Sequence, residues 1–562
     1  MYRLRSFIKT TSLFPGIILC LLCGCKQKSS GQTIAETPRE LQEKVTGLLQ
    51  EMGPSLTDGR ISGDTSTLLR QGNVTKLIYE SRQYQPLWSA EEKWLPVGDS
   101  LLNIIDAAKL YGLFPEDYYA NQLKTIRDKF NADSMAKGDR KDALLWTKAE
   151  LLLTDGLIQL MKDIKLGRLP NDSITLRKDS TLSNEFIQQK ITELLSSGSV
   201  TATLATLEPR HRGYHLLKQG IPAFLRKADY RQYTIVPSSK TPGFTTALQK
   251  RLFEAGYLPT DSVRADSVQL AAAIKKFQKD KNITVDGKAG EGTIRMLNTN
   301  DKEKFIRIAI SMDRYKMLPE KMPDRYIWVN ASSNYLEVID KDVVKFSSKV
   351  ICGKAKTRTP VLSSQISSLI TYPQWVPPPS IVSKEILPAV KKNPGYLAKK
   401  GFTLVNSEGE EVDPYSVDWS RYSKGIPYRI VQGSGDANAL GVMKFVFDNK
   451  YSVYLHDTNQ RYLFGNAMRS LSHGCVRVQD WEKLAVYIIK NDSIQTKGRN
   501  YTPVDSMKTW LRNKQKKNIA LRNKMPVFIR YITCEGKDGN ILFYDDVYAE
   551  DKLLREKYFA TR

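Results

Sequence analysis

Residues 452–478 read SVYLHDTNQRYLFGNAMRSLSHGCVRV, and this stretch holds Cys475 together with His456 and His473, two of the chain's four histidines. A thiol of ordinary pKa is only a few per cent thiolate at neutral pH, so a cysteine nucleophile needs a nearby base or a positive field. The two imidazoles could supply both. Gly474 permits a tight turn beside the sulfur, and backbone N–H groups at such a turn are natural donors to an oxyanion. The stretch therefore predicts a thiol enzyme that carries out acyl transfer.

Two other cysteines lie in apolar runs, Cys352 in VICG (350–353) and Cys534 in YITC (531–534). A cysteine in such a run is usually buried and inert. His, Gly and Arg flank Cys475 instead, which indicates an accessible thiol. Three cysteines remain after residue 25, too few for a disulfide framework, although a bond between Cys352 and Cys534 is left open.

The chain begins with a basic segment, continues with an apolar run over residues 13–22, and then reads LCGC at residues 22–25. Such a run is too short to span a bilayer comfortably, which takes about 20 residues. The pattern is typical of an export signal, and its last four residues resemble the lipobox of bacterial lipoproteins. The resemblance implies a signal peptide over residues 1–24 and lipidation of Cys25. The polar, Ser/Gly-rich composition that follows predicts a tether over residues 25–65 with room for one helix. An uncleaved anchor and an ordinary soluble signal peptide are the alternatives.

Basic residues outnumber acidic ones, 85 Lys and Arg against 60 Asp and Glu, for a formal net charge of +25. Such a charge favours an anionic partner. No nucleic-acid-binding motif accompanies it, so cell-wall polymer or an anionic membrane surface suits an exported chain better, and we do not expect nucleic acid as a partner. At about 150 residues a domain, the length predicts three or four domains.

His211 and His215 lie four residues apart, a spacing that could place a metal pair on one face of a helix. No HExxH arrangement and no third ligand accompany them, which favours a structural role. Residues 433–435 read GSG but lack the strand-to-helix context and the third glycine of a cofactor loop. We therefore expect neither a metal nor a cofactor.

Hydrophobic periodicity divides the rest of the chain. Apolar residues recur at helical spacing within residues 66–240, which predicts a helical scaffold domain. A compact unit follows at residues 243–300. Strand patterns beginning after about residue 325 predict a mostly β domain over residues 304–550. Within it, residues 385–435 are rich in Lys, Gly and Pro and could form a flap over the site. The expected fold class is multidomain α+β.

The compact unit contains LQKRLFEAGYL (248–258) and AIKKFQKDKNITVDGKAGEGTIRML (273–297). This pairing resembles the type 1 peptidoglycan-binding domain, a small three-helix module, over nearly all of its length. The apolar positions form the core of such a module and do not by themselves show a ligand contact. Binding of wall polymer is what the resemblance implies.

With His456 and SHGCVR at residues 472–477, the chain resembles the L,D-transpeptidases with a YkuD-type catalytic domain, and within them the large YcbB-like subgroup. The resemblance covers most of the chain after the signal. Its further matches are QYQPLW (83–88), GLFPEDY (112–118), MDRY (312–315), NALG (438–441) and YLHDT (454–458).

The resemblance implies an L,D-transpeptidase that forms 3→3 cross-links in peptidoglycan. Cys475 attacks the carbonyl between diaminopimelate and the terminal D-alanine of a tetrapeptide stem, D-alanine leaves, and the amine of a second stem resolves the thioester. His456 is the expected base. Backbone N–H groups from His473 through Gly474 to Cys475 are expected to hold the oxyanion, and either Ser472 or a backbone carbonyl is a candidate for orienting an imidazole.

Four further residues are candidates for substrate binding. Arg477 could bind a substrate carboxylate or form a structural pair, and Tyr454, Asn438 and Trp375 could line the pocket. We expect stem peptides as donor and acceptor, acylation of Cys475 by a carbapenem, and a protein anchored by lipid to a membrane of the cell envelope, facing the periplasm. With water as acceptor the same site would be an L,D-carboxypeptidase. The alternative from another class is a non-catalytic lipoprotein that anchors peptidoglycan.

Overall fold

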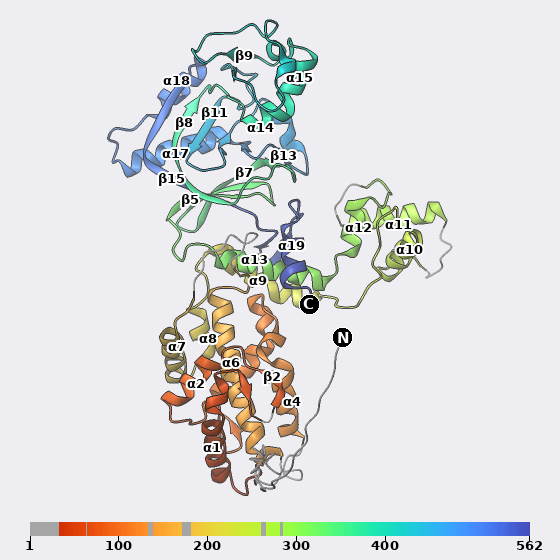
Figure 1. Cartoon of the computed structure of the whole chain (residues 1–562), viewed down its shortest axis with the longest axis vertical. Helices are drawn as coiled ribbons and strands as arrows, with labels where there is room; N and C mark the ends of the chain where they lie inside the picture. Colours follow the sequence, from red (N-terminus) through yellow and green to blue (C-terminus); the bar gives the residue numbers. More distant parts are fainter. Residues whose placement is uncertain are drawn as a thin grey trace, which may run out of the picture. The chain divides into compact units, whose positions relative to one another are not determined.

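The structure, a computed structural model, describes residues 33–62, 64–132, 139–170, 181–259, 266–281 and 285–561. The expected signal peptide and its lipidation residue Cys25 lie outside these residues. The described chain divides into two compact units (Figure 1). The first takes residues up to Ile105, Glu116–Gln159 and Asn184–Val200, and the second takes the rest. No helix in the described ranges has the length and apolar character that crossing a membrane requires.

The first unit is mainly helical. Its helices are α1 (Pro38–Leu56), α2 (Gly72–Ser81), α3 (Pro96–Asp106), α4 (Ala120–Asn131), the greater part of α6 (Ala143–Lys165) and α7 (Asn184–Ser197), with two short hairpins, β1–β2 (Arg60–Ile61, Asp64–Leu68) and β3–β4 (Ser89–Ala90, Lys93–Trp94). The buried carboxylate of Glu150 on α6 accepts hydrogen bonds from the backbone N–H groups of Leu87 and Trp88, at 2.7 and 3.0 Å. This pair of bonds ties the loop after α2 to the central helix.

Helix α1, of 19 residues, lies within the tether expected over residues 25–65. It begins after the N-cap Thr37, whose side chain accepts from the backbone N–H of Glu40. One face buries Leu41, Val45, Leu48, Leu49 and Met52. This is one helix within the segment, which the tether prediction allowed, and its apolar stripe at helical spacing packs into the first unit.

The module expected at residues 243–300 has three helices, α10 (Phe244–Glu254), α11 (Ser267–Asp280) and α12 (Glu291–Asn298), which confirms the predicted fold of this part (Figure 1). Its core is formed by Val236, Leu248, Leu252, Leu258, Ala273, Ile274, Phe277 and Leu297. The buried side chain of Gln278 accepts from the N–H groups of Asp286 and Gly287, at 3.0 and 2.9 Å, and so fixes the loop before α12.

The C-terminal part is built on nine strands: β5 (Arg325–Asn330), β6 (Tyr335–Asp340), β7 (Val343–Gly353), β8 (Leu362–Thr371), β11 (Met443–Phe447), β12 (Leu455–His456), β13 (Ser470–Ser472), β14 (Val476–Val478) and β15 (Lys517–Arg530). Their order is β13-β7-β14-β12-β11-β8-β15-β5-β6, and β6 also pairs with β7. The sheet therefore closes on itself. This agrees with the mostly β domain predicted from the strand patterns.

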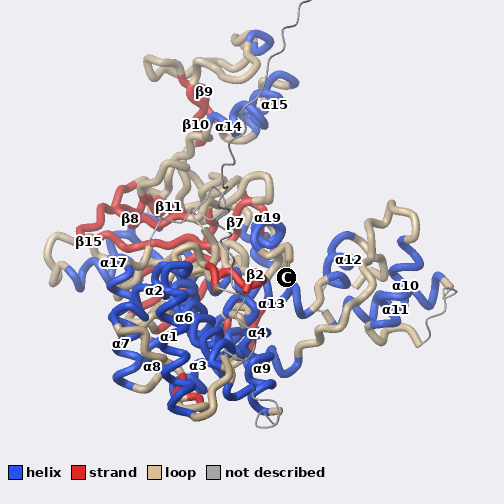
Figure 2. The backbone as a smooth tube through the Cα atoms, turned by 60° about the horizontal axis from the view of Figure 1, so that its bottom comes forward, coloured by secondary structure: helices blue, strands red, loops and turns tan. Residues whose placement is uncertain are grey.

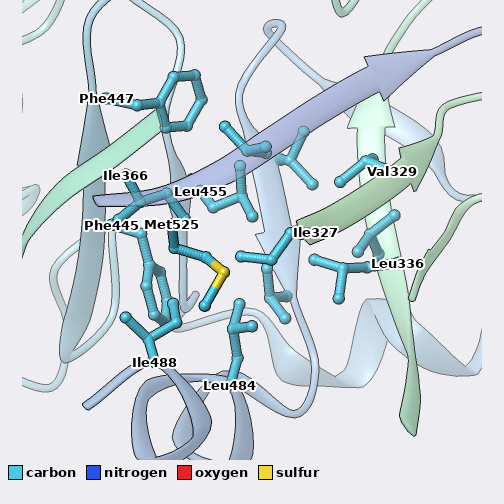
Figure 3. Close-up of a cluster of buried hydrophobic side chains, with 14 of the residues drawn as sticks. Ile327, Val329, Leu336, Ile366, Phe445, Phe447, Leu455, Leu484, Ile488 and Met525 are labelled. Carbon is cyan, nitrogen blue, oxygen red and sulfur yellow. The ribbon is translucent and has the colours of Figure 1, made fainter. Parts of the chain in front are cut away.

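The closed sheet surrounds an apolar core (Figure 3). Ile327, Ile366, Phe445 and Leu455 point into it from four strands. Helix α17 (Trp481–Gln495) covers one side and contributes Leu484 and Ile488. Burying side chains of this size contributes about 1.5–3 kcal/mol each, so the core fixes which face of every strand turns inward.

The segment expected as a flap over residues 385–435 is a small folded subdomain. It contains α14 (Pro379–Ile381), a π-helical turn (Val382–Ile386), α15 (Leu387–Lys392), α16 (Tyr396–Lys399), β9 (Phe402–Val405) and β10 (Arg429–Gln432). Figure 2 shows strands β9 and β10 beside helices α14 and α15. Its core, which includes Val390, Leu397 and Trp419, is separate from the core of the sheet.

Two helices depart from the expected domain limits. Helix α9 (Arg212–Lys227), expected in the scaffold domain of residues 66–240, packs on the hairpin of β16 (Cys534–Lys537) and β17 (Asn540–Phe543) in the second unit. A Cβ at Gly536 would come within 2.0 Å of the carbonyl oxygen of Leu216, so this hairpin needs glycine there. Helix α19 (Glu550–Tyr558) continues beyond residue 550.

Candidate active site

Cys475 lies in a tight turn between the short strands β13 and β14. The turn depends on Gly474, whose φ of +120° is rarely adopted by residues with a side chain. Ser472 braces it from within, because its hydroxyl accepts from the N–H of Gly474 at 3.1 Å and donates to the carbonyl of Cys475 at 2.6 Å. The candidate role of Ser472 in orienting an imidazole is therefore wrong: its hydroxyl is occupied within the turn.

The strand pairing places the candidate residues on one face of the sheet. Leu455 pairs with Val476 in the parallel ladder of β12 and β14, and His456 pairs with Arg477. Leu455 and Val476 belong to the apolar core. Since successive side chains in a strand alternate between faces, His456 and Arg477 lie on the opposite face.

By the same alternation, residues just before β12 and β14 and one residue of β11 lie on this face too. Tyr454 precedes Leu455, as Cys475 precedes Val476, and the Tyr454 and His456 rings are 5.6 Å apart between centroids. In β11, Met443 and Phe445 point into the core, while Lys444 between them is half-buried and pairs with His456. The face thus gathers a thiol, an imidazole, a phenol and two cations.

His456 is a buried, neutral imidazole. Burial lowers its pKa to about 3, and the positive charges of Arg477 and, least, Lys444 act in the same direction, while backbone groups at Asp457 and Leu440 act to raise it. Its Nδ1 is buried without a hydrogen-bond partner. A neutral imidazole has a lone pair free to accept a proton, which is what a general base requires.

Cys475 is partly exposed, but its thiol is not an activated thiolate in the resting structure. Burial raises its pKa, although Tyr454, Lys444 and Arg477 all act to lower it. Its Sγ donates weakly to the carbonyl of Ser452 at 4.0 Å. The expected positive field is therefore present, and desolvation outweighs it. A base must take the proton when the sulfur reacts.

Cys352 and Cys534 differ from Cys475 in being fully buried, and all three cysteines are free thiols. The possible disulfide between Cys352 and Cys534 is absent from the structure. Burial raises the pKa of both thiols to about 12. They are inert parts of apolar cores, as their sequence context predicted.

A loop over residues 353–359 holds the backbone of the cysteine turn from outside. The hydroxyl of Thr359 donates to the carbonyl of Gly474 at 2.8 Å and accepts from the N–H of Gly353 at 2.8 Å. The hydroxyl of Thr357 donates to the carbonyl of Ser472 at 2.9 Å. Thr359 is buried, and nothing in the sequence around it distinguishes it from an ordinary strand threonine.

The bond from Thr359 sets the direction of one peptide group. The carbonyl of Gly474 and the N–H of Cys475 belong to the same planar trans peptide, so they point in opposite directions. Because the carbonyl points at Thr359, the N–H points away from the loop. Among the described residues it has no hydrogen-bond acceptor. A donor held in place beside a nucleophilic sulfur, with no acceptor of its own, is what an oxyanion hole needs.

His473 is exposed and bonds through Nε2 to the carboxylate of Glu385 in the inserted subdomain. This contact joins the cysteine turn to the insertion. It leaves His473 directed at a surface carboxylate, so His456 is the imidazole on the face that carries Cys475.

Of the four candidate substrate residues, two lie on the face of Cys475, one lies where the insertion leaves the sheet, and one is buried in a turn. Tyr454 and Arg477 lie on the face of Cys475, and Tyr454 also interacts with the side chain of Trp375. Trp375 exchanges backbone hydrogen bonds with Gln432 of the insertion, at 3.0 and 2.7 Å, and thus lies where the insertion leaves the sheet.

Asn438 does not line the site. It is buried, its Nδ2 donates to the carbonyl of Gly433 at 2.8 Å, and its Oδ1 accepts from the N–H of Leu440 at 2.8 Å. Both ends of its side chain are engaged in a turn, so the prediction of a substrate contact is wrong for this residue.

Sequence reasoning missed Lys444 and Thr359. Alternation within residues 443–447 marks Lys444 as the polar member of a strand, but only the pairing of β11 with β12 brings it to His456. The contact of Thr359 with Gly474 spans 115 residues of sequence. No local sequence pattern predicts this contact.

No group of three or more His, Cys, Asp or Glu that could hold a metal was found within the described ranges. His211 caps helix α9, where its Nδ1 accepts from the N–H of Gly213 at 3.0 Å and its ring stacks on Tyr315. Burial lowers its pKa to about 4. This is a structural role, the one that the lack of an HExxH arrangement and of a third ligand favoured for His211.

Known families match three parts of the chain. Residues 324–504 match the "L,D-transpeptidase catalytic domain", residues 243–297 the "Putative peptidoglycan binding domain", and residues 73–221 a "Scaffold domain". The chain therefore contains a YkuD-type catalytic domain and a peptidoglycan-binding domain, in a multidomain α+β fold.

Among individual proteins, a "Putative L,D-transpeptidase" of Haemophilus influenzae is 32% identical over 264 residues, which are 47% of this chain and 52% of that protein. The chain thus spans about half the length of this curated relative. A solved L,D-transpeptidase of Stackebrandtia nassauensis is 17% identical, with 55% of this chain and 100% of that chain covered and a TM-score of 0.16. The avibactam carbamoyl enzyme of Ldtfm is 12% identical, with 53% and 92% covered and a TM-score of 0.17. Similarities at these TM-scores do not bear on function.

The raised pKa of Cys475 predicts how its alkylation depends on pH. Iodoacetamide reacts with thiolate, and a raised pKa means that the thiolate fraction still increases above neutral pH. The alkylation rate of the wild-type protein should therefore rise without levelling off between about pH 6 and pH 8.5, the range below an ordinary or raised thiol pKa. Mass spectrometry of the quenched protein follows the rate.

The Cys475→Ala variant is the control, and after proteolysis the peptide that holds residue 475 should stay unlabelled, as should those of the other two described thiols, which are buried. A rate that is flat across neutral pH would contradict the raised pKa, because it would mean a thiolate already formed in the resting protein.

Proposed function

We propose that this protein, through the catalytic domain at residues 324–504, is a cysteine-dependent L,D-transpeptidase that forms 3→3 cross-links in peptidoglycan. The observation that carries the proposal is the common sheet face of Cys475 and the neutral His456, with the unpartnered N–H of Cys475 at the turn. A nucleophile, a base and an oxyanion donor are the three groups that acyl transfer requires.

In the first step the sulfur of Cys475 forms a bond to the carbonyl carbon that precedes the terminal D-alanine. The thiol proton passes to His456, and the carbonyl oxygen becomes an oxyanion that the N–H of Cys475 stabilises. When the C–N bond breaks, the nitrogen of D-alanine takes the proton from His456 and leaves. A thioester with the tetrapeptide's third residue remains.

In the second step an amine of another stem attacks the thioester. Its proton passes to His456, the C–S bond breaks, and the thiol is restored with the proton. The new amide is the cross-link. Lys444 and Arg477 act to lower the pKa of the thiol, so they stabilise the negative charge that the sulfur carries during both steps.

We further propose that the chain is held at the cell envelope by two attachments. The peptidoglycan-binding domain at residues 243–297 and the net charge of +25 both suit an anionic wall polymer. Lipid on Cys25, after removal of residues 1–24, would hold the protein on a membrane, facing the periplasm.

The lipid attachment can be tested by metabolic labelling with a radioactive fatty acid. The wild-type protein should carry the label and Cys25→Ala should lose it, because the lipid is attached to that sulfur. Cys23→Ala is the matched control and should remain labelled. Label retained by Cys25→Ala would contradict this attachment site.

The catalytic proposal can be tested with purified protein and tetrapeptide muropeptides. Liquid chromatography with mass spectrometry should detect cross-linked dimers and free D-alanine with the wild-type protein. Cys475→Ala should lose both products, while Cys534→Ala, which removes a buried thiol of another core, should keep them. A carbapenem should add its mass to the wild-type protein and to Cys534→Ala only.

Other products would overturn the proposal in different ways. Tripeptide monomers without dimers would mean that water is the acceptor, so the protein would be an L,D-carboxypeptidase. If a folded protein left the substrate unchanged and formed no carbapenem adduct, the protein would not be an enzyme of this kind. The anchoring of peptidoglycan would then be its remaining function.

The peptide group held by Thr359 leads to a separate prediction. Thr359→Val removes the hydroxyl that fixes the carbonyl of Gly474, so the N–H of Cys475 is no longer held in place. We expect kcat to fall about 10- to 100-fold with little change in KM, since loss of a whole oxyanion donor costs about 100- to 1,000-fold. Thr359→Ser keeps the hydroxyl and should retain most of the activity.

Alkylation of Cys475 by iodoacetamide distinguishes this role from damage to the fold. That reaction forms no oxyanion, so its rate should be the same in Thr359→Val and the wild type. Equal losses of alkylation and of transpeptidation would contradict a role in oxyanion binding.

A further inference from the structure

Two cations lie on the face that carries Cys475, and neither has an anionic partner. Lys444 Nζ lies over the ring of Tyr454, 3.9 Å from its centroid. Arg477 donates from Nη1 to the side chain of Gln460 at 2.9 Å, and its Nε is buried without a hydrogen-bond partner. In the described part of the chain neither side chain forms an ion pair with a carboxylate.

Several buried cations of the second unit pair with a carboxylate, whereas the buried guanidinium groups of Arg251 and Arg469 donate to backbone carbonyls instead. Lys316 Nζ lies 3.0 Å from a carboxylate oxygen of Asp313, and Arg314 Nη1 lies 2.6 Å from one of Asp551. Leaving a partly buried charge unpaired costs free energy, so such charges usually have a partner in the protein or a ligand. The unpaired state of Lys444 and Arg477 is therefore an observation that points to a ligand. The chemistry that suits an ammonium and a guanidinium together is that of a carboxylate.

The strand register places the two cations on either side of the base. Lys444 pairs with His456 across β11 and β12, and His456 pairs with Arg477 across β12 and β14. Neighbouring strands are about 4.8 Å apart, so the three side chains form a row across the sheet with the imidazole in the middle. An anion held by both cations must lie next to His456.

In the proposed reaction, the carboxylate of the leaving amino acid is the anion that comes next to His456. His456 gives its proton to the nitrogen of the leaving amino acid, so that nitrogen lies at the imidazole when the bond breaks. The carboxylate of a C-terminal amino acid is two bonds from its nitrogen. The carboxylate of the leaving amino acid therefore lies at the row formed by Lys444, His456 and Arg477.

We propose that Lys444, together with Arg477, binds the terminal carboxylate of the donor peptide and makes the enzyme specific for donors whose terminal carboxylate is free. This inference rests on the proposed function. The cation–π contact with Tyr454 holds the ammonium in place before the substrate arrives. Lys444 is a substrate-binding residue, and among the described side chains only the Cys475 sulfur, when ionised, offers it a negative charge on this face.

The inference can be tested with two donors, a tetrapeptide stem with a free terminal carboxylate and the same stem with a terminal carboxamide. Lys444→Met removes the charge and keeps an unbranched side chain. We expect it to lower kcat/KM for the carboxylate donor about 10- to 100-fold more than for the carboxamide donor, the worth of a hydrogen bond to a charged group, because any loss of charge stabilisation at the thiol affects both donors alike. Release of the terminal amino acid or its amide is the measurement.

Two matched variants complete the test. Lys444→Arg keeps the charge and should keep a preference for the carboxylate donor. Lys450→Met is the control, because the Lys450 ammonium also lies over a tyrosine ring, that of Tyr451 at 5.3 Å, but Lys450 follows the end of β11. It should behave as the wild type with both donors.

The outcomes separate this inference from the proposed function. If Lys444→Met lowers kcat/KM equally for both donors, Lys444 acts on the thiol or on the fold and the inference fails, while the proposed function stands. An unchanged preference for the carboxylate donor in Lys444→Met also overturns it. A wild-type protein that releases nothing from either donor overturns the proposed function and the inference with it.

Discussion

The candidate site depends on one pairing, the parallel ladder between β12 and β14, in which Leu455 lies beside Val476. These strands have only two and three residues and could not hold a register alone. They hold it because β11 pairs with β12 and β7 pairs with β14, and because the sheet closes through β6 and β7. A slip of one residue would turn His456 into the apolar core. The core side chains therefore decide where the chemistry lies.

Burial of the site has opposite consequences for its two reacting groups. It raises the pKa of Cys475 and lowers that of His456, so both are neutral at rest. Neutral partners can be desolvated at little cost, which lets the site be partly buried without a permanent ion pair. Charge then appears only during the reaction, when the oxyanion donor and the two cations are already in place. This is the arrangement in which fixed dipoles and charges act most effectively.

Local motifs predicted the parts of the site that are close in sequence. Cys475, Gly474 and His456 could be singled out because the residues beside them are unusual for a strand core, and the three-helix module because its apolar spacing is regular. Thr359 and Lys444 could not, since each meets the site only through pairing with distant strands. Asn438 and Ser472 were predicted to act in the site, but their side chains hydrogen-bond to backbone groups of their own turns, as polar side chains in turns often do.

The row formed by Lys444, His456 and Arg477 also bears on how the base works. Both cations contribute to the low pKa of His456, and a base with a pKa of about 3 accepts a proton poorly at neutral pH. A carboxylate bound between the cations would offset their charge at the imidazole and raise its pKa toward the useful range. Binding of the donor would then strengthen the base in the same step that delivers the carbonyl to the sulfur. In the absence of a donor the imidazole would remain a weak base beside a protonated thiol, and the site would react slowly with other electrophiles.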